Sequence, residues 1–168
     1  SQETRIIESL SPVFGSHIIY GLEGTEEALT NYKKALEHAK KTKDNFIIAC
    51  ALDWLTYHSF WKMHSLEDPD EARLLLEVGV DYAKEAKQHY QQLSYTSPRA
   101  DLAWTDGIDV EHLASLTHFA TDITKKHDLM EKAVRASTET RRIAEQSGYP
   151  EAMMYARNGF SNLQATLS

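Results

Sequence analysis

In the run Gly24-Thr25-Glu26-Glu27-Ala28-Leu29-Thr30-Asn31-Tyr32-Lys33-Lys34-Ala35-Leu36, the residues Ala28, Tyr32 and Ala35 fall at i, i+4 and i+7. This spacing places them along one stripe of an α-helix. The two alanines leave room for a neighbouring helix to approach closely. The run therefore predicts a helix that packs against a second helix in a hairpin.

The same spacing returns twice along the chain of 168 residues. The second triplet, Ala72, Leu76 and Gly79, keeps both the spacing and the residue sizes. The third triplet, Ala133, Ser137 and Thr140, keeps only the spacing. The first run resembles the second helix of a tetratricopeptide repeat. The later triplets match less well and are separated by longer intervals than in that family, so the chain resembles a divergent member. The resemblance implies an all-α fold, a right-handed stack of antiparallel helical hairpins, and a protein-binding scaffold.

Composition and capping patterns support the all-α prediction. Glycine and proline are few, with 7 and 4 residues, and 42% of the residues are hydrophobic. Asp68 followed by Pro69 is a helix start, and Ser147-Gly148-Tyr149-Pro150 ends one helix and opens another. Thr25, Asp109 and Asp128 are further predicted caps. The predicted helices cover 25–43, 45–63, 70–93, 109–126, 128–147 and 150–166.

We expect two parts in the chain. Residues 25–168 form the helical repeat domain, and residues 1–24 form an N-terminal segment, for which the partner helix of the first repeat is one interpretation. The chain begins with Ser1 rather than Met, which fits a tag remnant or a fragment, and we expect a piece of a longer regulatory or signalling protein.

The charge and the hydropathy of the chain limit the classes of partner that it can bind. The net charge is −7, and both halves of the chain carry more acidic than basic residues. Such a chain lacks the positive field that gives nonspecific affinity for nucleic acid. There is no apolar run near ~18 residues and no signal peptide, so we expect no membrane contact and a cytoplasmic protein.

An aromatic stripe follows one face of the helix predicted over 45–63. Trp54, Tyr57, His58 and Trp61 are spaced at i, i+3, i+4 and i+7. Trp and Tyr dominate interface hot spots, so the stripe is a candidate binding surface. The helix is apolar almost all round, however, and core packing between hairpins is the preferred interpretation.

The segment from Leu93 to Gly107 shows no clear helical period. A connection of this length between hairpins is typically either disordered or functional. It carries Tyr95, Arg99 and Trp104, residue types that are enriched at interfaces. The sequence leaves two interpretations open, a binding element or a structural cap on the stack.

The last predicted helix is apolar almost to the terminus. Phe160, Leu163 and Leu167 form its stripe. Because terminal repeats expose apolar edges unless something covers them, we expect this helix to contact a second copy of the chain or the next domain of a longer protein. The alternative is that the stripe packs wholly inside its own hairpin.

No complete catalytic, metal or cofactor motif is present despite eight histidines. The sequence has no His-Glu-x-x-His, no phosphate loop and no nucleophile elbow. We therefore predict a non-catalytic protein-protein interaction scaffold or regulatory module that binds a protein or peptide and no metal. The alternative is a metal-assisted enzyme or small-molecule sensor in a helical bundle, in which histidines and acids converge: His58, His112 and His118 with Asp53 or Asp122.

Overall fold

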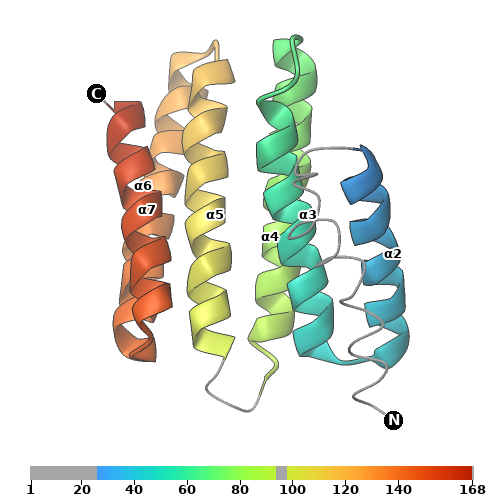
Figure 1. The fold of residues 1–168 in the computed structure, drawn as a ribbon. Helices are drawn as coiled ribbons and strands as arrows, with labels where there is room; N and C mark the ends of the chain where they lie inside the picture. The colour runs from blue at the N-terminus through green and yellow to red at the C-terminus, as the bar shows by residue number, and fades with distance from the viewer. Residues whose placement is uncertain (1–25, 94–97, 168) are drawn as a thin grey trace.

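A computed structural model describes residues 26–93 and 98–167, and these residues form helices and short connections without a β-strand. The all-α prediction is therefore confirmed for the described residues (Figure 1). The helices are α2 (Glu26–Thr42), α3 (Asn45–Met63), α4 (Pro69–Tyr90), α5 (Pro98–Phe119), α6 (Ile123–Ser147) and α7 (Pro150–Leu167).

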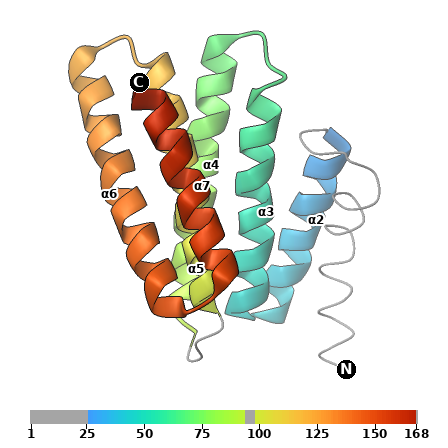
Figure 2. The same cartoon turned by 60° about the vertical axis from the view of Figure 1, so that its left-hand side comes forward.

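The helices run up and down as consecutive antiparallel neighbours. Each described helix packs against the next one in the chain, and α5 also contacts α3 and α7. Among these helices α2 contacts only α3, so α2 and the α6–α7 hairpin lie at opposite ends of the row (Figures 1 and 2). Among the described helices, none covers the remaining side of the α6–α7 hairpin. No described helix is long and apolar enough to cross a membrane.

Side chains and glycine geometry fix the helix ends. Asp68 accepts a bond from the Asp70 backbone N–H at 2.8 Å, with Pro69 at the first helical position, as the sequence predicts. Asp44 caps α3 in the same manner. Gly148 ends α6 in the left-handed conformation at φ 71°, which glycine adopts without steric cost.

The repeated triplets lie at helix contacts. All nine residues are buried: Ala28, Tyr32 and Ala35 on α2, Ala72, Leu76 and Gly79 on α4, and Ala133, Ser137 and Thr140 on α6. On α4 a Cβ added at Gly79 would collide with the ring of His112 on α5. The small residue at this position therefore lets α4 and α5 approach closely.

Two predicted boundaries are wrong. Helix α5 begins at Pro98, so most of the expected connection between Leu93 and Gly107 is helical, and Asp109 lies inside α5 rather than at its start. The α5 pattern lacks one apolar stripe because the helix packs against α3, α4, α6 and α7.

The boundary between the fourth and fifth predicted helices also moves. Helix α6 begins at Ile123, capped by Asp122, whose Oδ1 accepts from the Lys125 backbone N–H at 2.8 Å. Asp128 is an interior residue that pairs with Lys132 instead of capping. The residue that caps a helix must leave the helical conformation. The spacing of Asp128 and Glu131 predicted this residue at position 128, six positions after the cap at Asp122.

Candidate functional site

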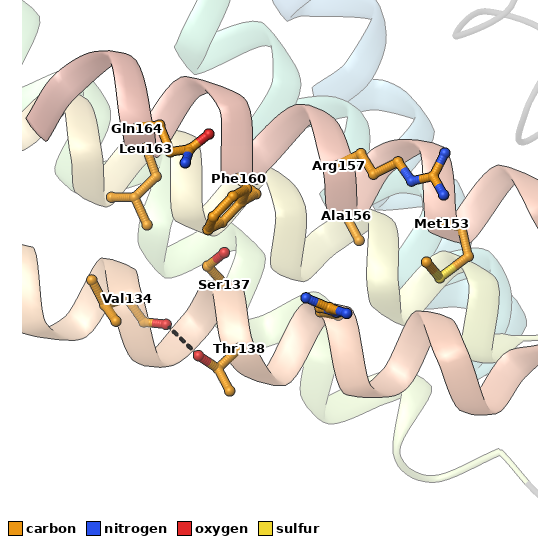
Figure 3. A pocket seen from close by; sticks show the side chains of 10 residues that line it. Val134, Ser137, Thr138, Met153, Ala156, Arg157, Phe160, Leu163 and Gln164 are labelled. Carbon is orange, nitrogen blue, oxygen red and sulfur yellow. Dashed lines mark hydrogen bonds between the residues drawn. The ribbon is translucent and has the colours of Figure 1, made fainter. Parts of the chain in front are cut away.

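An apolar groove lies between α6 and α7 on the described surface (Figure 3). Its cavity volume is about 570 Å³. Two helices supply the whole lining, which we call the α6–α7 groove: Val134, Ser137, Thr138 and Arg141 from α6, and Met153, Ala156, Arg157, Phe160, Leu163 and Gln164 from α7.

The position of α7 against α5 shapes this groove. A Cβ added at Gly159 would lie 3.2 Å from the carbonyl oxygen of Gly107 on α5. The two glycines therefore let α7 lie close to α5. Each residue advances about 100° around a helix, so Phe160, which follows Gly159, faces away from this contact. Its ring lies over Ser137 of α6 (Figure 3).

The groove exposes apolar surface between buried residues. Phe160 is 51% exposed and Val134 is 46% exposed, whereas Ala156 and Leu163 beside them are buried. Single exposed apolar residues are ordinary, but a contiguous apolar patch in a concave surface is typical of a binding site. The groove has the shape and chemistry to take an apolar side chain from another molecule.

Two arginines give the groove its charge. Arg141 binds the carboxylate of Glu145, with 2.8 Å between Nε and Oε1, and keeps most of its side chain in solvent. Arg157 makes no ion pair with any residue that the structure describes. No acidic residue lines the groove. It therefore favours a partner that brings a carboxylate with its apolar group.

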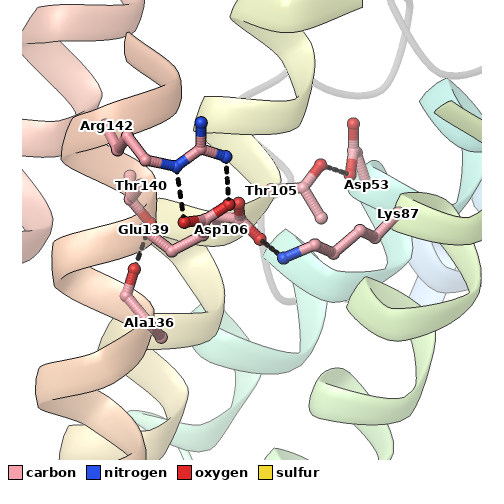
Figure 4. Close-up of polar contacts among 8 residues, drawn as sticks. All are labelled: Asp53, Lys87, Thr105, Asp106, Ala136, Glu139, Thr140 and Arg142. Carbon is pink, nitrogen blue, oxygen red and sulfur yellow. Dashed lines mark hydrogen bonds and ion pairs between the residues drawn. The ribbon is translucent and has the colours of Figure 1, made fainter. Parts of the chain in front are cut away.

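A second feature is a polar cluster shared by α3, α4 and α5, the middle helices of the row, which we call the centre (Figure 4). The buried carboxylate of Asp53 on α3 accepts hydrogen bonds from the Tyr90 hydroxyl at 2.5 Å and from the Thr105 hydroxyl. Lys87 on α4 binds the buried carboxylate of Asp106 on α5, with 2.6 Å between Nζ and Oδ1. These bonds join three helices, and they offset the cost of burying the two acids.

Burial raises the pKa values of three acids on α5, Asp106, Asp109 and Glu111, and the first two of them also interact with each other. Burial raises the pKa of Asp109 to about 6, and the neighbouring Asp106 carboxylate adds to the shift. Burial also raises the pKa of Asp106, although Lys87 acts to lower it. Asp106 Oδ2 and Asp109 Oδ1 have no hydrogen-bond partner among the described residues. Both acids are therefore more easily protonated than an exposed aspartate.

The aromatic stripe of α3 packs largely against its own neighbours. The Trp54 ring stacks on Tyr32 of α2 with 6.1 Å between centroids, and the Tyr57 ring makes edge contacts with Trp54 and Trp61. His58 is buried, and Trp61 is 44% exposed. Trp54 and Tyr57 are half-buried, so only His58 has the full burial of a core residue, and the core and the binding interpretations of the stripe both stay predictions.

The predicted terminal stripe divides into two kinds of residue. Phe160 is exposed in the groove, and Leu163 is buried in the core that α7 shares with α4, α5 and α6. Leu163 therefore supports the fold and is unsuited as an exposed contact. Four predicted binding or interface residues lie outside what the structure describes: Tyr95, together with the side chains of Arg99, Trp104 and Leu167.

The residues of the alternative catalytic site come from α3, α5 and the residue that caps α6. His58 and His112 are buried on α3 and α5, and His118 is exposed near the end of α5. Asp53 is bonded to hydroxyl groups and Asp122 caps α6. Within 26–93 and 98–167, no group of three or more His, Cys, Asp and Glu residues could hold a metal ion.

Sequence reasoning missed most of the groove. Val134, Arg141 and Arg157 look like ordinary surface residues of amphipathic helices. The sequence signal that did point to the groove is Phe160, a member of the predicted apolar stripe of the last helix. Comparisons with protein-family models, curated proteins and solved structures found no match to this chain.

Proposed function

We propose that this protein is a non-catalytic helical interaction module that binds an amphipathic helix of a protein partner in the α6–α7 groove. The observation that carries the proposal is that the side chains of Phe160 and Val134 are exposed in a groove with a volume of about 570 Å³. An amphipathic helix commonly lays its apolar face into such a groove, anchored by side chains at i, i+3 and i+4.

The stacked hairpins support this proposal. The buried triplets on α2, α4 and α6 place small residues at successive helix contacts, as expected for a tetratricopeptide-like stack. In such stacks each repeat covers its neighbour, and the last one needs a cap or a partner. The α6–α7 groove occupies this terminal position in the row of helices.

The groove also defines what the partner carries. Its apolar centre favours Leu, Met or aromatic anchors, and Arg141 and Arg157 favour an acidic residue beside them. A partner helix with basic residues next to its anchors would face repulsion from both arginines. The proposal therefore predicts a partner segment that is apolar on one face and acidic at its margin.

Selection from a peptide library tests the proposal, because the groove itself then chooses the sequences that it binds. Phage-displayed random peptides are selected on the wild-type protein and then counted for binding to Phe160→Gln and to Ile123→Gln. Ile123 is a matched control because it is 76% exposed on α6 and lies about three turns before Val134, outside the groove.

We expect enriched peptides with apolar residues at helical spacing and at least one acid, and at least tenfold weaker binding to Phe160→Gln than to Ile123→Gln. Enrichment of basic peptides would contradict the proposed chemistry. Equal binding to the wild type and Phe160→Gln would show that the groove is not the binding surface.

A further inference from the structure

A second surface of the same molecule is complementary to the groove. Leu74 is 53% exposed and Val78 is 44% exposed on α4, and their spacing of four residues places them side by side on one helix face. We call this pair the α4 ridge. Neither residue belongs to a core cluster of the described chain.

The charge around the α4 ridge is opposite to that of the groove. Residues 67–81 contain six acids and one base. Glu71 lies one turn before Leu74 and is exposed, and it makes no ion pair with a described residue. Arg157 in the groove likewise makes no ion pair with a described residue. Each surface thus holds an apolar centre and a charge that the other could neutralise.

We propose that a second copy of this chain is an occupant of the α6–α7 groove, with the α4 ridge of one molecule lying between α6 and α7 of the next. This inference rests on the proposed function, because it uses the same groove. A ridge formed by residues at i and i+4 packs well into the groove between neighbouring rows of side chains. Leu74 and Val78 contact Phe160 and Val134, and Glu71 lies near Arg157.

A symmetric dimer through two facing grooves is disfavoured. It would bring the unpaired Arg157 of both copies together, with no acid among the described lining residues to separate them, because Glu145 already binds Arg141. The ridge and the groove lie on different helices, so one molecule can use both at once. The interface is therefore head-to-tail, and each dimer keeps one free groove and one free ridge.

This asymmetry allows a complementation experiment by sedimentation velocity. Leu74→Gln removes the centre of the ridge but keeps the groove, and Phe160→Gln removes the centre of the groove but keeps the ridge. Both residues are about half exposed, so circular dichroism should show folded helices for both variants. Ile123→Gln serves as the control that alters neither surface.

We expect the average mass of the wild type and of Ile123→Gln to rise with protein concentration, and each of the other two variants alone to stay monomeric. An equal mixture of Leu74→Gln and Phe160→Gln should form a dimer that grows no further, because only one intact ridge and one intact groove can meet.

Three results would overturn the second-copy inference: a wild type that stays monomeric at all concentrations, a mixture without dimer, or association that survives Leu74→Gln. If peptides selected on the groove still bind in that case, the proposed function stands and the occupant is another protein. If no peptide depends on Phe160 either, both proposals fail.

Discussion

The centre and the C-terminal edge of this molecule depart from the usual distribution of residues in opposite ways. The centre buries the carboxylates of Asp53 and Asp106, whereas the edge exposes Phe160 and Val134. Both departures cost free energy in an isolated chain. At the centre, hydrogen bonds from other helices reduce this cost, while no described residue covers the edge.

The difference separates structural from functional candidates. A buried acid with bonds from Tyr90, Thr105 or Lys87 holds α3, α4 and α5 together, so its loss should appear as lost stability. An exposed apolar residue in a groove contributes little to folding, so its loss should appear as lost binding. The predictions below test this division, beginning with the largest effect.

Asp53→Ala should lower the free energy of unfolding by about 3–5 kcal/mol. The substitution removes the hydrogen bonds that this buried carboxyl group accepts from Tyr90 and Thr105, and it leaves both hydroxyls without this acceptor. Urea unfolding followed by circular dichroism measures the change. Asp128→Ala, at an exposed pair with Lys132, is the control and should change little. A loss below about 1 kcal/mol for Asp53→Ala would show that the centre does not depend on this carboxylate.

Leu163→Ala should cost about 2–5 kcal/mol, because the side chain is 3% exposed in the core shared by α4, α5, α6 and α7. The same residue on an exposed interface would cost much less. Thermal and urea unfolding both report the change. A stability equal to that of the wild type would show that Leu163 belongs to the exposed groove surface of the C-terminal edge and does not stabilise the core.

Asp109→Asn should make stability less dependent on pH. The folded-state pKa of Asp109 is about 6, above the ordinary value of 3.8, because burial and the Asp106 carboxylate disfavour its charge. The folded state therefore binds the proton more tightly than the unfolded state, and stability falls as pH rises from about 4 to 6. This fall is worth up to about 3 kcal/mol and is absent in the variant.

Urea midpoints at several pH values test this sign. The two proteins should be close in stability near pH 4, and Asp109→Asn should be the more stable one at pH 7. Asp128→Asn is the control, since this aspartate is exposed and pairs with Lys132 on the surface of α6. A variant that gains nothing between pH 4 and pH 7 would show that the Asp109 carboxylate is well solvated in the folded protein.

Phe160→Gln should change the free energy of unfolding by no more than about 1 kcal/mol, the smallest effect in this series. Half of the ring is already in water, so little burial is lost. Ile123→Gln, at a more exposed position, should change it even less. A loss above about 2 kcal/mol for Phe160→Gln would make this residue part of the core and remove the contrast between centre and edge.

The sequence predicted the parts of the fold that depend on local signals. Asp68-Pro69 and Gly148 marked helix ends correctly, and the triplet Ala28, Tyr32 and Ala35 marked a buried face. These features arise within one or two turns of chain. Helix count and hairpin order followed from them for the described residues.

The parts that depend on packing from several sides were missed. Helix α5 has no single apolar stripe because four helices surround it, so its first three turns read as a loop. The groove was missed because the close approach of Gly159 to Gly107 sets the position of α7, and that contact joins residues 52 positions apart. No local sequence pattern shows that the side chains of Phe160 and Val134 remain exposed to solvent.

The central claim is that the α6–α7 groove, rather than the aromatic stripe of α3, receives the partner. Nuclear magnetic resonance of the labelled protein with a peptide selected from the library tests it most directly. We predict that amide shifts concentrate at Val134, Arg141 and Phe160 and disappear in Phe160→Gln. Shifts centred on Trp54 and Trp61, with none in α6 and α7, would contradict the account.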